Sequence, residues 1–228
     1  MSSKRYNLLP KETKKLKKDT FDKLIAIVKK NCTTKFDESI DVHMQVNVKQ
    51  KKSEVNLRTA VNLPAGTGKK TKIAVVCEDS KLAEAKKSGA DVIGSDDLIK
   101  EISTGKINFE KLIATPGMMI KLSKLGKVLG PKGLMPNPKL GTVSENIIET
   151  VNASKLGQIE IKNDKDGNIG FTVGKKSFSN ENLIKNFNAI LETMQKEKPS
   201  GIKGDLIKNV FITSTMGVPY KLKLDKNF

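Results

Sequence analysis

Two segments rich in glycine and lysine carry the residue types that bind phosphate. Residues 63–71 read Leu-Pro-Ala-Gly-Thr-Gly-Lys-Lys-Thr, and residues 126–141 hold Lys127, Lys132 and Lys139 between glycines and prolines. Glycine lets a backbone approach an anion closely, and lysine supplies the opposite charge. These segments could therefore bind phosphate, either in a nucleotide-hydrolysing site or at a contact with RNA.

The first segment departs from a nucleotide-binding loop at the positions that matter. That loop needs a glycine five residues before its Gly-Lys pair and a serine or threonine directly after it, but Leu63 and Lys70 stand there. The segment also precedes an apolar run, whereas a phosphate loop follows a strand and leads into a helix. The glycines of the second segment have the wrong spacing for a dinucleotide site. We therefore expect no enzyme and no cofactor.

Net charge favours a polyanionic partner. The 228 residues contain 42 Lys+Arg against 25 Asp+Glu, a formal charge of +17, and Arg5 and Arg58 are the only arginines. Lysine suits phosphate contact more than bidentate reading of base edges. Aromatic residues make up only 4%, without tryptophan, which argues against a large base-stacking platform. A folded RNA that is read by its shape fits these properties best.

Cysteine spacing and hydropathy bear on location and on metals. The sequence shows no apolar run of membrane-spanning length and no signal-peptide hydrophobic region, so we expect a cytoplasmic protein without a membrane partner. Cys32 and Cys77 stand alone, with no second ligand at metal-binding spacing. Two reduced thiols and no metal site are expected.

Patterns at the two ends of the chain predict antiparallel α+β structure. In residues 40–48 apolar side chains alternate with polar ones, which is typical of a half-buried strand. Residues 180–196 place apolar side chains along one helical stripe that ends before Pro199. The other elements expected there are a helix over 20–31, strands over 57–63, 207–213 and 218–224, and a hairpin of strands 158–162 and 169–173.

The middle of the chain has a different pattern. Residues 72–77 form a continuous apolar run, as in a parallel strand covered on both faces. A capping box from Thr142 to Glu145 is expected to start a helix that buries Ile147, Ile148 and Val151. Between them we expect helices over 80–88, 96–104 and 116–125, strands over 90–94 and 109–114, and a loop over 126–141 that is neither helix nor strand.

The order of these patterns predicts the fold class. An α+β domain with an antiparallel sheet, formed by residues 1–67 and 157–228, is split by an inserted Rossmann-like three-layer α/β domain, residues 68–156. The chain then crosses twice between the domains, and two crossings would make a natural hinge.

Several motifs, taken in order, resemble one known family along nearly the whole chain. The chain is similar to the bacterial ribosomal protein "L one" family, the stalk protein of the large ribosomal subunit. The motifs are Lys-Phe-Asp-Glu-Ser-Ile-Asp-Val-His at 35–43, Val-Asn-Leu-Pro at 61–64 before Gly-Thr-Gly-Lys at 66–69, Ala-Thr-Pro at 114–116, Leu-Gly-Pro-Lys-Gly-Leu-Met-Pro-Asn-Pro-Lys at 129–139 with Gly-Thr-Val at 141–143, and Thr-Ser-Thr-Met-Gly at 213–217.

This resemblance implies an rRNA-binding site on the split domain. The residues that carry over are Phe36, Thr215, Met216 and Gly217, and Thr213 and Ser214 precede them in the same turn. Lys35 and Arg58 are expected to contact phosphate on the same domain. Asn209 stands where the family pattern has a serine, so the outer contacts stay open. Lys127, Lys132 and Lys139 are assigned as a secondary RNA contact or a domain-closing element, and a purely structural role is equally open.

The resemblance also implies a function. The protein would be a structural component of the large ribosomal subunit that binds 23S rRNA to form the mobile stalk, helps release tRNA from the exit site, and represses its own operon by binding its mRNA. We expect a monomer when it is free. Two other classes stay open at this point: a phosphate-handling enzyme on the βα insert, and a non-specific nucleic-acid coat protein, which would bind RNA and DNA alike.

Overall fold

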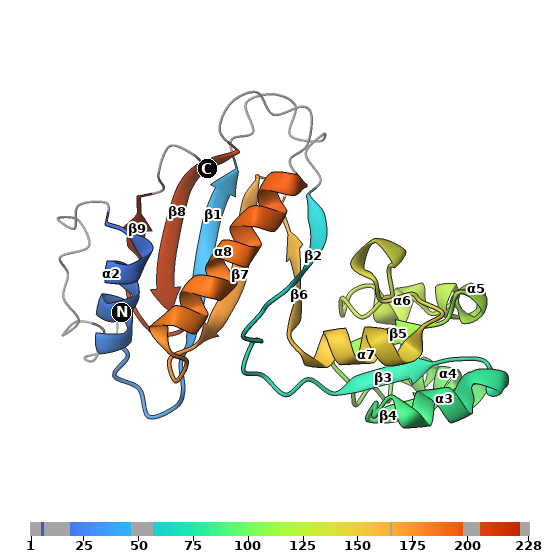
Figure 1. Cartoon of the computed structure of the whole chain (residues 1–228). Helices are drawn as coiled ribbons and strands as arrows, with labels where there is room; N and C mark the ends of the chain where they lie inside the picture. Colours follow the sequence, from blue (N-terminus) through green and yellow to red (C-terminus); the bar gives the residue numbers. More distant parts are fainter. Residues whose placement is uncertain (1–5, 7–18, 47–56, 165, 198–205, 224–228) are drawn as a thin grey trace. The chain divides into compact units, whose positions relative to one another are not determined.

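The chain divides into two compact units in the computed structural model, residues Met1–Gly68 with Ile159–Phe228, and residues Lys69–Gln158 (Figure 1). The structure describes residues 6, 19–46, 57–164, 166–197 and 206–223. Both sheet types predicted from the sequence are present, so the protein is of mixed α/β type. Within the described residues no helix is both long enough and apolar enough to span a membrane.

The first unit is built on a four-stranded antiparallel sheet in the order β7-β1-β8-β9. These strands are β1 (Ser39–Val46), β7 (Asn168–Lys175), β8 (Ile207–Ser214) and β9 (Tyr220–Leu222). Buried and outward side chains alternate along β1, as its sequence predicted. Val48, the last residue of that predicted alternation, lies outside the described residues.

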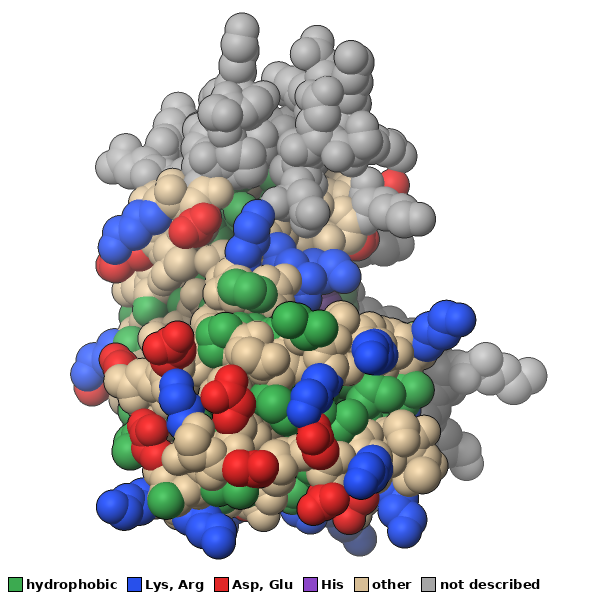
Figure 2. Space-filling model, turned by 90° about the vertical axis from the view of Figure 1, so that its right-hand side faces the viewer, with side chains coloured by type: hydrophobic (Ala, Val, Ile, Leu, Met, Phe, Trp, Pro, Cys, Tyr) green, Lys and Arg blue, Asp and Glu red, His purple; other side chains and the backbone are tan. Residues whose placement is uncertain are grey.

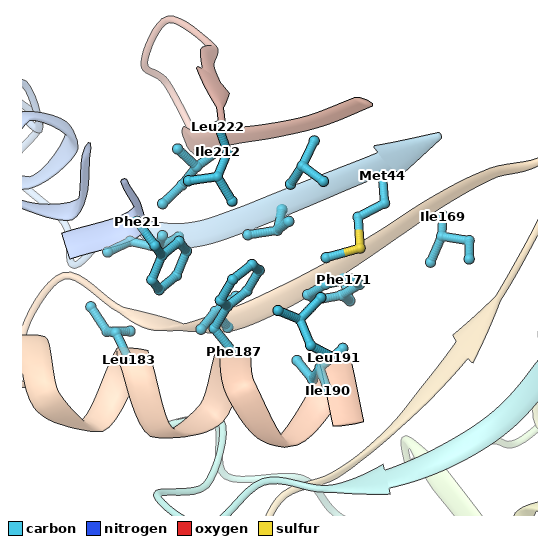
Figure 3. Packing of buried hydrophobic residues seen from close by; sticks show 14 of the residues in the cluster. Phe21, Met44, Ile169, Phe171, Leu183, Phe187, Ile190, Leu191, Ile212 and Leu222 are labelled. Atoms are coloured by element: carbon cyan, nitrogen blue, oxygen red, sulfur yellow. The ribbon is translucent and has the colours of Figure 1, made fainter. Parts of the chain in front are cut away.

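Helices α2 (Phe21–Lys30) and α8 (Asn180–Lys196) bury the apolar side of this sheet. In Figure 3 the side chains of α8 point toward those of the strands, and the ring of Phe21 stacks on Phe187 with centroids 3.9 Å apart. The Ser179 side chain accepts a hydrogen bond from the Asn182 amide and so caps the start of α8. One continuous apolar core therefore supports the sheet.

The predicted hairpin of residues 158–162 and 169–173 is wrong. Strand β6 (Gln158–Lys162) pairs with β2 (Arg58–Asn62) in a separate two-stranded sheet. Asn163 fixes this choice, because its amide donates to the Leu57 carbonyl and its side chain accepts from the Leu57 amide at 2.7 Å. Among the described residues, only a single bridge between Asn163 and Ile169 links the two segments.

The second unit has a parallel sheet in the order β4-β3-β5, formed by Val92–Gly94, Ile73–Val76 and Lys111–Ala114. All four residues of β3 are buried, and alternate ones belong to two apolar clusters. A strand covered on both faces is what its apolar run predicted. The helical segments are η2 (Asp79–Lys81), α3 (Leu82–Lys87), α4 (Asp96–Ser103), η3 (Pro116–Met118), α5 (Met119–Ser123), α6 (Gly126–Leu129), η4 (Pro138–Leu140) and α7 (Ile147–Lys155).

Two local predictions in this unit are wrong. Residues 126–141 contain the one-turn helix α6 and the 3-10 turn η4, in which the Asn137 side chain accepts from the Lys139 amide. The capping box does not form, because residues 142–144 lie beside β5 through hydrogen bonds with Ala114. Helix α7 starts at Ile147 instead, with Asn146 as its cap, and Ile148 is 36% exposed instead of buried.

The Gly-Thr-Gly segment of residues 66–68 is held by the interior of the first unit. Asn186 on α8 is fully buried, and its side chain accepts from the Ala65 amide and donates to the Gly66 carbonyl, both at 2.9 Å. Gly68 adopts a φ of +70°, and a Cβ there would lie 2.8 Å from the ring of Phe178. The segment therefore uses its glycines to pack within the fold.

Candidate RNA interface

The start of β1 and the end of β8 meet at one end of the two central strands of the four-stranded sheet, because these strands run antiparallel with Ile40 opposite Ser214. This pairing brings residues 34–39 against the turn of residues 213–217. The Thr215 amide donates to the Ser39 carbonyl at 3.1 Å, and the Thr215 hydroxyl accepts from the Ser39 amide at 3.0 Å. We call these two segments together the edge cluster.

A buried carboxylate, Glu38, joins the two segments of the edge cluster. Its side chain accepts from the Thr34 hydroxyl at 2.8 Å and from the Met216 amide at 3.2 Å, and it is fully shielded from solvent. Burial alone would raise the pKa of Glu38, but hydrogen bonds from Ser214, Thr34 and the Met216 amide outweigh it and hold the pKa below the usual value. The charged carboxylate thus fixes the geometry of the turn.

Two large apolar side chains of the edge cluster are exposed to solvent. Phe36 is 51% exposed and Met216 is 49% exposed, although both belong to segments whose backbones are tied down. Lys35, next to Phe36, is exposed as well. Exposed apolar side chains on an ordered backbone are available for contact with a partner, and the neighbouring lysine suits an anionic one.

Gly217 closes the turn against Ser214. Its amide donates to the Ser214 carbonyl at 3.1 Å, and a Cβ at this position would lie 2.4 Å from the Ser214 hydroxyl oxygen. The Thr213 hydroxyl donates to the same carbonyl at 3.1 Å. A side chain at position 217 would therefore displace the Ser214 hydroxyl, which bonds to Glu38.

Arg58 is not part of the edge cluster. It opens β2, which pairs with β6 in the two-stranded sheet, whereas the edge cluster lies where β1 begins (Figure 1). Its guanidinium Nε lies 2.7 Å from Glu160 Oε1 on the neighbouring strand. Its charge is therefore shared with a carboxylate of the same small sheet.

Lys127, Lys132 and Lys139 belong to the second unit and are exposed. That unit carries 15 lysines against 10 acidic residues, which leaves 27 Lys+Arg and 15 acidic residues in the first unit. On the face seen in Figure 2, the described lysine side chains are interspersed with acidic ones. The first unit therefore has the larger excess of positive charge.

Glu38 is the central residue of the edge cluster, and the sequence reasoning missed it. It lies in the motif at 35–43, but neither the motif nor the resemblance singles it out. Its position offered a signal, since the buried side chains of β1 fall on even numbers from Ile40 to Val46 and Glu38 extends that series. A carboxylate on the inward side needs donors, and those donors define the cluster.

Neither thiol is poised for reaction. Burial raises the pKa of Cys32 and of Cys77, which keeps both protonated at neutral pH. In the part of the chain that the structure describes, no group of three or more His, Cys, Asp or Glu side chains is arranged to hold a metal ion.

Comparison with known proteins identifies the family. Residues 28–218 match the model of the ribosomal protein L1p/L10e family. The large ribosomal subunit protein uL1 of Pelagibacter ubique is 67% identical over 99% of both chains, and that of Fervidobacterium nodosum is 43% identical over 98% of this chain and 95% of its own. The large ribosomal subunit protein uL1c of Phaeodactylum tricornutum is 44% identical over 98% of this chain and 97% of its own. The chain therefore belongs to the ribosomal protein L1p/L10e family, as a structural protein of the large ribosomal subunit in the cytoplasm and not an enzyme.

Proposed function

We propose that the edge cluster is the main binding site for 23S rRNA. The observation that carries this proposal is the buried Glu38, which holds Phe36 and Met216 out in solvent on opposing segments. Such side chains offer apolar contact to ribose and base faces, and Lys35 offers a phosphate contact. A partner read by shape needs a rigid surface of this kind.

Thr215 has a positioning role in this site. Its hydroxyl accepts from the Ser39 amide and lies 3.4 Å from the Ser39 carbonyl, to which it donates. A hydroxyl has one donor and two acceptor positions, so one acceptor remains for a ribose 2′-OH. Thr213 and Ser214 support the turn, and Gly217 contributes by leaving room for the Ser214 side chain.

We propose that the two domains have different roles. Residues 1–67 and 157–228 would form the split rRNA-binding domain, where most of the positive charge lies, and residues 68–156 the mobile inserted domain. Arg58 would add a phosphate contact away from the edge cluster. Lys127, Lys132 and Lys139 would make a secondary RNA contact or help close the domains.

Further roles follow from binding RNA on the ribosome. We propose that the protein forms the mobile stalk with 23S rRNA, helps tRNA leave the exit site, and represses translation of its own operon by binding an rRNA-like structure in the mRNA, with a monomer as the free form. Unchanged exit-site tRNA release from ribosomes that lack the protein would count against the tRNA role. An operon-leader reporter whose translation is unaffected by added protein would count against repression.

The main test is a titration against an rRNA stalk fragment and a scrambled RNA of equal length across a salt series. Thr215→Val and Met216→Ala leave net charge unchanged, and Ile120→Ala is a matched control, because Ile120 is 75% exposed in the other unit. We expect each edge-cluster variant to lose about tenfold in affinity for the stalk fragment at an unchanged salt slope. Equal binding of both RNAs by all variants would show that charge alone binds, as in a coat protein.

A further inference from the structure

The side of the four-stranded sheet that faces away from the core, here called the open side, carries exposed and half-buried side chains among the described residues. Side chains of β7, β1, β8 and β9 that alternate with the buried ones point to this side and form rows across the strands. The central row runs from Gly170 through His43 and Phe211 to Lys221, which are direct partners in the sheet register. This row is the one place on the open side where an aromatic ring is exposed among the described residues.

We call this central row, Gly170, His43, Phe211 and Lys221, the shelf. Phe211 is 36% exposed, and His43 lies directly opposite it on β1, so their Cβ atoms are about 5 Å apart. The imidazole of His43 lies close to Gly170, where a Cβ would come within 3.1 Å of it, so the missing side chain makes room for the ring. The Lys221 ammonium lies 5.8 Å from the centroid of the Phe211 ring. Phe211 thus has His43 as its neighbour on one adjacent strand, and the ammonium of Lys221 from the other adjacent strand lies over its ring.

Polar groups border the shelf on both sides. On one side Thr172 donates to Asp41 at 2.6 Å, with Thr213 on the next strand. On the other side Asn209 donates to Gln45 at 2.9 Å. Amides and hydroxyls can pair with base edges and with the 2′-OH, and the one carboxylate of this surface, Asp41, already receives a hydrogen bond. Such a surface suits a nucleotide better than an apolar partner.

We propose that His43 and Phe211 form a stacking site for a single unpaired base of the bound RNA, with Lys221 contacting the adjacent phosphate. This inference rests on the proposed RNA-binding function. Phe211 lies two residues before Thr213, so the shelf begins about 7 Å from the edge cluster, a span of about two stacked nucleotides. The scarcity of aromatic residues argues against an extended platform, but one base needs only these two rings.

Variants of Phe211 test this site with matched chemistry. Phe211→Tyr keeps the ring and Phe211→Ser removes it, and neither changes the net charge or the buried face of β8. Against the rRNA stalk fragment, we expect the serine variant to lose between about 5- and 150-fold in affinity at an unchanged salt slope, and the tyrosine variant to bind as wild type. Lys221→Gln should instead lower the salt slope by about one.

The outcomes separate this inference from the proposed function. If Thr215→Val weakens binding and Phe211→Ser does not, the edge cluster stands and the stacking site is wrong. If the wild type does not distinguish the stalk fragment from scrambled RNA, the proposed function fails first. A second measurement guards against misfolding of the serine variant: on wild-type protein with labelled phenylalanine, bound RNA should move the Phe211 ring resonances upfield and leave those of buried Phe187 in place. Unmoved Phe211 resonances would overturn the stacking site.

Discussion

Replacing Glu38 by glutamine removes the charge at the centre of the edge cluster and almost none of the volume. The carboxylate accepts hydrogen bonds on both oxygens, from Thr34 on one and from the Met216 amide on the other. Glutamine has a single acceptor oxygen, so its NH₂ group must face one of these donors. The backbone amides of Thr34 and Met216 donate to opposite oxygens and cannot reverse, so one of them loses its partner, at about 1–3 kcal/mol, and the remaining bonds fall from charged to neutral strength.

We therefore expect Glu38→Gln to destabilise the first unit by about 2–4 kcal/mol, a large part of the roughly 5–15 kcal/mol typical of folded proteins. Because the chain has two units, the assay must report on one of them. Hydrogen exchange of the peptide over residues 206–223, read by mass spectrometry at increasing urea, follows the opening of β8 and the turn.

The matched control for this variant is Asp37→Asn. Asp37 is the neighbouring residue and is exposed, and its carboxylate bonds only to Ser177 among the described hydrogen bonds. The control removes the same charge, but it should cost less than about 1 kcal/mol, because water can replace the lost partner. An equal loss in both variants would refute the reasoning, since the effect would then be one of net charge.

Three further predictions concern the same unit. Gly217→Ala should weaken binding of the rRNA stalk fragment by tenfold or more in the RNA titration, because the new Cβ would lie 2.4 Å from the Ser214 hydroxyl. The control Gly126→Ala, whose Cβ would meet no atom within 4 Å, should bind as wild type. Because the pKa of Glu38 is lower in the folded protein, its charge stabilises the fold above the unfolded pKa of about 4.3, and this stabilisation is lost as pH falls through the folded pKa. The difference in free energy of unfolding between wild type and Glu38→Gln should therefore be constant above about pH 5 and shrink below it, as measured by denaturation at a series of pH values. Asn186→Ala should lower the free energy of unfolding by about 2–4 kcal/mol in urea denaturation, since its three hydrogen bonds lie in the interior; a loss below 1 kcal/mol would contradict this assignment.

Periodicity predicted much of the fold because it follows burial directly. The alternation in β1, the apolar run of β3 and the stripe of α8 each reflect one packed face, and all three lie where they were expected. Local motifs were less reliable where a distant partner competed. The turn after β6 is a good hairpin signal, yet Asn163 bonds to Leu57, about a hundred residues earlier, and β6 pairs with β2.

The site shows the same limit. Composition predicted an anionic partner, but only the family resemblance singled out Phe36 and Met216, because a lone exposed phenylalanine or methionine has no periodic signature. The role of Glu38 depends on donors from residues 34 and 216, which become neighbours only through the pairing of β1 with β8. Sequence spacing does not indicate that these two residues are neighbours in the fold.

The order of the strands has a consequence for synthesis of the protein. Strand β1 lies between β7 and β8, which are translated more than a hundred residues later, while the second unit is continuous in sequence. During translation residues 69–158 can fold as soon as they emerge, but β1 must wait without either neighbour until the last segments are made. The contact of Ser39 with Thr215, 176 residues apart, forms at the end of this process. The edge cluster therefore forms only on a chain translated through residue 217, and a shorter product would lack the RNA site proposed above.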